Sequence, residues 1–193
     1  MALHLILLAA GEGTRMVSDT PKVLHEIAGL PIFAHALRSA GGMDGRRVIV
    51  TGHEAERVAA AAVTHDPEIL TVVQSDQNGT AHAVTTAAPK LQGATGDAVV
   101  LFADTPFVSP RTIAAMPEAR AGGADIVVLG FQAADPARYG RLVTIGDRLE
   151  KIVEFKDATE EEREITLCNS GVMMAEVGTL LDLAGSTTDD NAA

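Results

Sequence analysis

Glycine, arginine and lysine residues follow the first apolar run of the chain closely enough to form a phosphate-binding loop. Gly11 and Gly13 come directly after this run and form a loop, which Arg15 and Lys22 flank. Glycines let backbone N–H groups approach phosphate oxygens, and the two cations suit a triphosphate. Because ligands of α/β proteins bind at the carboxyl ends of strands, the position favours a nucleotide site. By itself, Gly-x-Gly is equally typical of a tight strand-to-helix turn.

Short apolar runs that alternate with segments of helical spacing would position this loop. Continuous apolarity is typical of strands buried on both faces. The expected strands are Leu3–Ala9, Arg47–Thr51, Ile69–Val73, Ala98–Phe102, Asp125–Phe131 and Cys168–Ala175. The expected helices are Pro31–Ala40, Glu54–Val63, Thr80–Pro89 and Pro110–Ala121. The alternation predicts βαβ units, and therefore an α/β, Rossmann-like fold with a mostly parallel sheet and helices on both faces.

The pattern changes after Ala133. Arg141–Ile145 and Arg148–Glu154 are two apolar runs joined by Gly146-Asp147, which predicts a hairpin and hence a small antiparallel insertion. The next segment, Lys156–Glu164, is dense in charge and predicts a solvated helix or loop.

Composition limits the class of protein. A length of 193 residues suits one domain, and a net charge of −11 without a Lys/Arg-rich run argues against nucleic acid as a partner. The longest apolar stretch, Leu5 to Ala10, is far shorter than the roughly 20 residues of a membrane helix, so no membrane insertion is expected. A single cysteine, Cys168, and no visible secretory signal predict a cytoplasmic protein.

Several longer blocks resemble the sugar nucleotidyltransferases. The string LAAGEGTRMVSDTPKVLHEIAGLPIFAH resembles their signature LAAGxGTRM…PKxLHxxxGxPM, and residues 72–84 and 101–113 are similar to their uracil and metal segments. Residues 139–143, 152–164 and 168–176 resemble the amino-sugar segments of the N-acetylglucosamine-1-phosphate uridylyltransferase branch. The chain departs from the family pattern at Asn78, at Phe102-Ala103 and at Phe155.

The resemblance implies an enzyme that uses Mg²⁺ to transfer a uridylyl group from UTP to N-acetylglucosamine 1-phosphate. The products are pyrophosphate and UDP-N-acetylglucosamine, a cell-wall precursor. The attacking phosphate oxygen is already anionic at neutral pH, so the reaction needs no general base. Catalysis then consists of positioning and charge neutralisation.

The resemblance also implies roles for individual residues. Arg15 and Lys22 are expected to hold the triphosphate during catalysis, and Asp104 is expected to bind Mg²⁺. The implied nucleotide contacts are Leu8, Ala10, Gly11, Gly13, Gln74, Gly79 and Thr80. The implied sugar contacts are Gly140, Glu154 and Asn169.

Two alternatives remain open. One is another transferase on the same scaffold, MobA-like or using GTP, CTP or glucose 1-phosphate. The other is a truncated, non-catalytic nucleotide-binding protein. Residues 187–193 resemble a point where the family runs on, so we expect residues 1–193 to be one C-terminally truncated domain. Such a chain would lack a second Mg²⁺ ligand and the left-handed β-helix acetyltransferase domain. It would turn over poorly, and its exposed apolar surface would favour a homo-oligomer.

Overall fold

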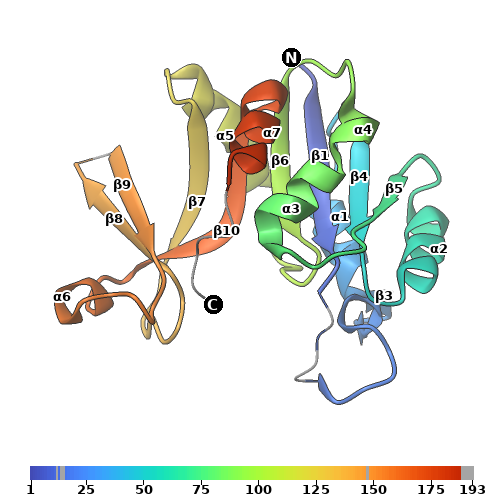
Figure 1. Ribbon diagram of the computed structural model, residues 1–193, viewed down its shortest axis with the longest axis horizontal. Coiled ribbons are helices and arrows are strands. Elements are labelled where there is room, and N and C mark those ends of the chain that lie inside the picture. The colour runs from blue at the N-terminus through green and yellow to red at the C-terminus, as the bar shows by residue number, and fades with distance from the viewer. Residues whose placement is uncertain (12, 14–15, 147, 188–193) are drawn as a thin grey trace. The chain divides into compact units, whose positions relative to one another are not determined.

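A computed structural model describes residues 1–11, 13, 16–146 and 148–187. The chain divides into two compact units (Figure 1). The first unit comprises Met1–Val127 and Met174–Ala193, and the second comprises Val128–Met173.

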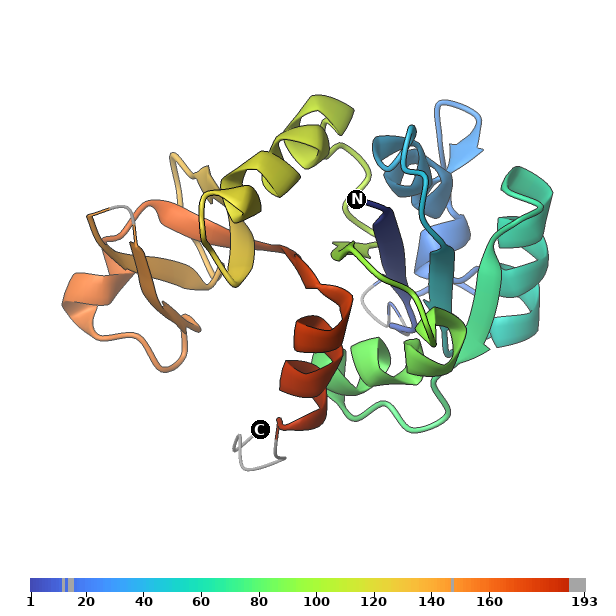
Figure 2. The same cartoon turned by 90° about the horizontal axis from the view of Figure 1, so that it is seen from above.

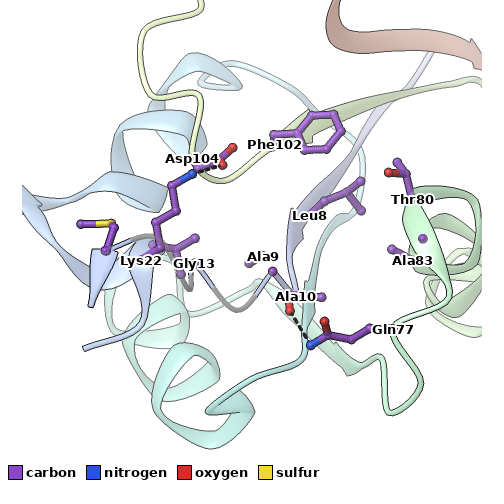
Figure 3. A pocket seen from close by; sticks show the side chains of 14 residues that line it. Leu8, Ala9, Ala10, Gly13, Lys22, Gln77, Thr80, Ala83, Phe102 and Asp104 are labelled. Atoms are coloured by element: carbon purple, nitrogen blue, oxygen red, sulfur yellow. Dashed lines mark hydrogen bonds and ion pairs between the residues drawn. The ribbon is translucent and has the colours of Figure 1, made fainter. Parts of the chain in front are cut away.

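The first unit contains a parallel sheet with its most buried residues at the centre. Its strands, in spatial order, are β5 (Leu70–Val73), β4 (Arg47–Thr51), β1 (Leu3–Ala9) and β6 (Asp97–Phe102). The middle residues of β1, β4 and β6 are buried on both faces, which is why these strands read as continuous apolar runs. Leu8 lies opposite Phe102 where β1 and β6 end (Figure 3). The predicted mostly parallel sheet is confirmed.

Helices cover both faces of this sheet, as predicted. The helices α1 (Ile32–Ser39) and α5 (Pro110–Ala121) lie on one face, and α3 (Gly79–Thr86) and α7 (Val177–Gly185) lie on the other (Figures 1 and 2). The helix α2 (Ala55–His65) contacts α1 and β4. Within the described residues, no helix has the length and apolar character that a membrane crossing requires.

Three features of the first unit differ from the sequence analysis. The single helix expected over Thr80–Pro89 is two, α3 and then α4 (Ala88–Leu91). The break falls just before Pro89, which lacks an N–H group and therefore fits better in the first turn of a new helix than in the interior of a longer one. The helix α7 was not predicted. The segment after the glycine loop holds a short 3-10 helix, η2 (Lys22–Leu24), and the strands β2 (Glu26–Ile27) and β3 (Leu30–Pro31).

The second unit contains the predicted hairpin. Its strands β8 (Arg141–Ile145) and β9 (Arg148–Val153) pair antiparallel, although Asp147 of the predicted turn lies outside the described residues. On its other side, β8 pairs antiparallel with β10 (Leu167–Glu176), which also pairs with β7 (Ile126–Gln132). The charged segment forms a short helix, α6 (Glu160–Arg163), with a capping box between Thr159 and Glu162.

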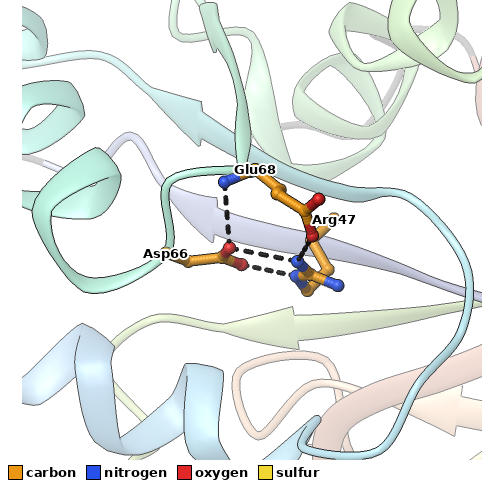
Figure 4. Close-up of polar contacts among 3 residues, drawn as sticks. All are labelled: Arg47, Asp66 and Glu68. Carbon is orange, nitrogen blue, oxygen red and sulfur yellow. Dashed lines mark hydrogen bonds and ion pairs between the residues drawn. The ribbon is translucent and has the colours of Figure 1, made fainter.

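An ion-pair cluster lies at the amino end of the parallel strands, where β4 begins (Figure 4). The Arg47 guanidinium donates two hydrogen bonds to the Asp66 carboxylate, one of them 3.0 Å long, and a third of 3.2 Å to Glu68. The Asp66 carboxylate also accepts the backbone N–H of Glu68 at 3.1 Å. The hydrogen bonds from Arg47 hold the pKa of Asp66 below its ordinary value, because they stabilise the charged form.

We predict that Asp66→Asn lowers the free energy of unfolding at pH 7 by about 1–3 kcal/mol, because a largely buried guanidinium loses its charged partner. The depressed pKa of Asp66 means that this stabilisation is fully present above the unfolded pKa of about 3.9. It disappears as the pH falls through the lower folded value, so the two proteins should converge in acid. Urea unfolding between pH 7 and pH 3 measures this. Glu68→Gln is the matched control, because the Glu68 side chain is 85% exposed. A constant difference across that pH range would contradict the prediction.

Candidate functional site

A cavity of about 590 Å³ opens in the first unit at the carboxyl ends of β1 and β6 (Figure 3). Its wall is formed by the end of β1, the glycine loop, η2, the start of α3 and the end of β6. The lining residues are Leu8, Ala9, Ala10, Gly11, Gly13, Met16, Lys22, Val23, Gln77, Gly79, Thr80, Ala83, Phe102 and Asp104. This is the edge of an α/β sheet at which ligands bind.

Lys22 and Asp104 face one another in this cavity (Figure 3). The Lys22 Nζ atom lies 2.6 Å from Asp104 Oδ2, and the two side chains are 38% and 35% exposed. The pair joins η2 to the turn after β6, so it links the two segments that the sequence had assigned to phosphate and to metal. Since both charges remain open to solvent, a ligand can reach either of them.

Gly13 brings the loop backbone close to Lys22. Its φ angle is +63°, in the left-handed region, and a Cβ atom added to it would lie 2.6 Å from the Cβ of Lys22. Gly11 differs, because a Cβ atom there would meet nothing within 4 Å. The second glycine of the motif is therefore required by the backbone conformation and by the position of Lys22.

Two glutamines of the expected uracil segment have different environments. Gln77 lines the cavity and donates a hydrogen bond of 3.2 Å to the carbonyl of Ala10. Gln74 is only 5% exposed and does not line it. The Gln74 amide donates to the carbonyl of Gly79 at 3.1 Å and lies 3.0 Å from His82 Nδ1. Sequence reasoning missed Gln77, although it belongs to the same motif.

Most of the residues predicted to bind nucleotide and metal converge on this cavity. Those that line it are Leu8, Ala10, Gly11, Gly13, Lys22, Gly79, Thr80 and Asp104. Gln74 lies behind Gly79, so its direct contact with a base stays a prediction. Arg15 lies outside the described residues.

The residues predicted to bind the sugar lie together in the second unit. Arg141 of β8 is paired with Val153 on one side and with Cys168 on the other. In the neighbouring row, Gly140, which precedes Arg141, lies between Glu154 and Asn169. A Cβ atom on Gly140 would lie 3.0 Å from Glu154 Oε1, and the Asn169 N–H donates to the Gly140 carbonyl at 2.8 Å. Residues far apart in the sequence thus form one row, in which Gly140 precedes β8, Glu154 follows β9 and Asn169 belongs to β10.

A second cavity, of about 380 Å³, lies beside this row. It is lined by Arg138, Glu154, Phe155 and Lys156, which offer one carboxylate, two cations and an aromatic ring. These groups can accept and donate hydrogen bonds to hydroxyls and can attract an anion.

The family model of the MobA-like NTP transferase domain matches residues 5–165. Among the curated relatives, the "Bifunctional protein GlmU" of Dinoroseobacter shibae is 56% identical over 100% of this chain and 43% of its own length. The protein of the same name from Paracoccus denitrificans is 48% identical over 98% of this chain and 42% of its own. The chain therefore spans less than half the length of these relatives.

Solved structures resemble the whole chain in fold. The inositol-1-phosphate CTP transferase of T. maritima has a TM-score of 0.77 at 18% identity, over 98% of this chain and 76% of its own. A UDP-glucose pyrophosphorylase complexed with UDP-glucose has a TM-score of 0.72 at 18% identity, over 97% of this chain and 81% of its own. At such identities the likeness is one of fold alone, and it confirms the predicted fold class.

We expect Gly13→Ala to lower the free energy of unfolding by about 1–2 kcal/mol, because an L side chain is strained in the left-handed region. The added methyl group must also displace Lys22. Gly11→Ala is the matched control and should change stability by only a few tenths of a kcal/mol, since the space around it is open. Urea unfolding of the two variants provides the comparison. Equal stabilities would show that the loop does not need a glycine at position 13.

Proposed function

Because this chain belongs to the MobA-like NTP transferase family, we propose that it transfers a uridylyl group from UTP to N-acetylglucosamine 1-phosphate. The family membership and the relatives confirm the prediction of a nucleotidyltransferase. The choice of UTP and of an amino-sugar phosphate is our inference. It rests on the motifs of the chain and on the residues that gather within each unit by itself.

The ion pair between Lys22 and Asp104 is the observation that carries this proposal. A triphosphate needs a cation, and a divalent metal needs a carboxylate, and one cavity of the first unit contains both. In the pair, each charge neutralises the other. Binding of a triphosphate with its metal would give Lys22 phosphate oxygens as its partner and would release Asp104 for the metal.

The residues of the cavity fit Mg²⁺ bound together with a nucleotide. In the described part of the chain, no three His, Cys, Asp or Glu side chains gather into a metal cluster, so Asp104 is its single proposed ligand here. Mg²⁺ commonly takes one or two carboxylates and completes its shell with phosphate oxygens and water. When bound, it would neutralise phosphate charge. We therefore propose that Mg²⁺ binds with the nucleotide rather than ahead of it.

The proposed reaction requires no proton transfer from the protein. An oxygen of the sugar phosphate attacks the α-phosphorus of UTP, and the bond from that phosphorus to the bridging oxygen of the β-phosphate breaks. Pyrophosphate leaves with the electron pair. Lys22 would hold the phosphates in line, and the open space over Gly11 would let backbone N–H groups reach them.

Recognition of uracil is proposed for the segment that begins α3. Gly79 and Thr80 line the cavity together with Leu8, and the buried Gln74 amide donates a hydrogen bond to the carbonyl of Gly79. Side-chain and backbone amides can donate and accept together, which matches the imide edge of uracil. The row of Gly140, Glu154 and Asn169 is proposed to contact the sugar hydroxyls and the N-acetyl group.

Two other functions are distinguished by one assay. A transferase with another nucleotide would release pyrophosphate from that nucleotide, and a binding protein without catalysis would release no pyrophosphate. Pyrophosphate release should be measured with GlcNAc 1-phosphate, Mg²⁺ and each of UTP, CTP, GTP and ATP. Release with UTP alone supports the proposal, release with another nucleotide replaces it, and nucleotide binding without any release indicates the binding protein.

We predict that Asp104→Asn lowers the rate of pyrophosphate release by about 10²–10³-fold while the protein stays folded. The substitution keeps the size of the side chain and removes the charge proposed to hold Mg²⁺. Asp76→Asn is the matched control, because Asp76 is exposed and does not line the cavity. Rates at several Mg²⁺ concentrations, with circular dichroism for folding, test this. An Asp104→Asn rate equal to that of the unaltered chain at limiting Mg²⁺ would rule out the metal role.

We also predict that Asn169→Ala narrows the preference for GlcNAc 1-phosphate over glucose 1-phosphate by about tenfold or more, because a buried site discriminates through groups that expect a partner. The ratio of kcat/KM for the two sugar phosphates is the measurement. Asn78→Ala is the matched control, since Asn78 lies in the first unit. An unchanged ratio in Asn169→Ala would remove this residue from the sugar site.

A further inference from the structure

Arg141 is a buried cation whose hydrogen bonds all go to backbone carbonyls. Its side chain belongs to the second unit and is 2% exposed. The Nη1 atom donates to the carbonyls of Pro136, at 3.3 Å, and Tyr139. The Nη2 atom donates to Ala137 at 3.1 Å and to Arg163 at 3.2 Å, and Nε also donates to Arg163, at 3.4 Å. Because a guanidinium has five N–H groups, every donor has an acceptor.

This arrangement is not the usual way to bury a charge. Among the described residues, Arg141 forms no ion pair with a carboxylate. Its guanidinium carbon lies 5.6 Å from the centre of the Phe155 ring, which adds a cation–π contact. An apolar side chain would fill the same space without the cost of desolvating a cation. The guanidinium adds a planar set of donors that holds its acceptors in a defined geometry.

The carbonyls that accept hydrogen bonds from Arg141 belong to two segments beside the row of Gly140, Glu154 and Asn169. Three of them come from residues 136–139, which lead directly into Gly140, and the fourth comes from the end of α6. Ala137 has a φ angle of +39°, which an L residue rarely adopts, so this loop needs support from its surroundings. Arg141 supplies that support at the carbonyl of Ala137 itself.

We propose that Arg141 is a positioning residue for the sugar site and acts through the loop 136–140. The inference rests on the proposed function, since it assumes that Gly140, Glu154 and Asn169 bind the sugar. Arg141 directly follows Gly140 in the chain. Its strand partners, Val153 and Cys168, directly precede Glu154 and Asn169. Gly140 leaves little space beside Glu154, because even a Cβ atom would approach its carboxylate to 3.0 Å. A loop freed from Arg141 would therefore shift both the carboxylate and the carbonyl that accepts from Asn169.

Arg141→Met tests the proposal, with Arg163→Met as the matched control. Arg163 also lies over the Phe155 ring, at 4.8 Å, but its side chain is exposed and only its backbone carbonyl contacts Arg141. The affinities of each protein for UDP-GlcNAc and for UDP are measured by calorimetry, and their ratio isolates the contribution of the sugar. We expect Arg141→Met to reduce this ratio about tenfold or more while the affinity for UDP changes less than about twofold, because small displacements of positioned groups are costly. Arg163→Met should leave both affinities unchanged.

Arg141→Ala provides a second test, which can be used even if Arg141→Met is unstable. Guanidinium ions at concentrations below those that unfold the protein should enter the space left by the side chain and restore the ratio, whereas methylammonium ions should not. Hydrogen exchange of the amides of residues 137–140 and of Asn169 should be faster in the variant and slow again with guanidinium.

The outcomes distinguish a failure of the positioning role of Arg141 from a failure of the proposed function. A variant that loses thermal stability but keeps the ratio of affinities would mean that Arg141 is structural only, and would overturn this inference alone. Equal losses of affinity for UDP and UDP-GlcNAc would overturn it as well. If the unaltered chain binds UDP-GlcNAc no better than UDP, the proposed function fails, and the inference fails with it.

Discussion

Parallel pairing of β1 with β6 determines where the cavity of the first unit can form. The register places Leu8 opposite Phe102, and the N–H of Ala103 continues the pairing by donating to the Leu8 carbonyl at 2.9 Å. The chain therefore leaves both strands at one edge of the sheet. The glycine loop follows one strand and Asp104 follows the other. Without this register, the ion pair between Lys22 and Asp104, which are 82 positions apart in the sequence, could not form.

The two units use cations in contrasting ways. Lys22 is partly exposed and forms an ion pair with Asp104. Such a pair stabilises the chain weakly and can be exchanged for a ligand at little cost. Arg141 is buried, and its donors are shared among the carbonyls of one loop and one helix end. A compact ammonium on a flexible stem suits the first task, and a planar guanidinium suits the second.

Charged residues at the other edge of the parallel sheet have a structural role. Arg47 begins β4 and binds Asp66, which lies between α2 and β5. Its contacts tie the amino ends of two neighbouring strands, whereas the cavity lies at the carboxyl ends. The Arg47 cluster and the cavity thus lie at opposite edges of one sheet, so a substitution in the Arg47 cluster can change stability without touching the cavity.

The sequence by itself determined the class of fold and the motif residues. Strands buried on both faces must be apolar throughout, and this constraint is local enough to read from runs such as Leu3–Ala9. Glycine at position 13 is equally local, because its backbone angle is strained for a residue with an L side chain. The hairpin of β8 and β9 followed from Gly146 between two apolar runs.

Only the tertiary structure decided which of these residues meet. Gln74 and Gln77 look alike in the sequence, yet one is buried behind Gly79 and the other lines the cavity. The helix α7 escaped prediction, and its partner α3 lies far earlier in the chain. In the sequence, Arg141 is one more charged residue of a motif. The carbonyls that surround it are set by strand register and loop conformation, which only the structure shows. Hydrophobic patterning reports which residues are buried, but hydrogen-bond partners depend on contacts between distant segments, which no local pattern encodes.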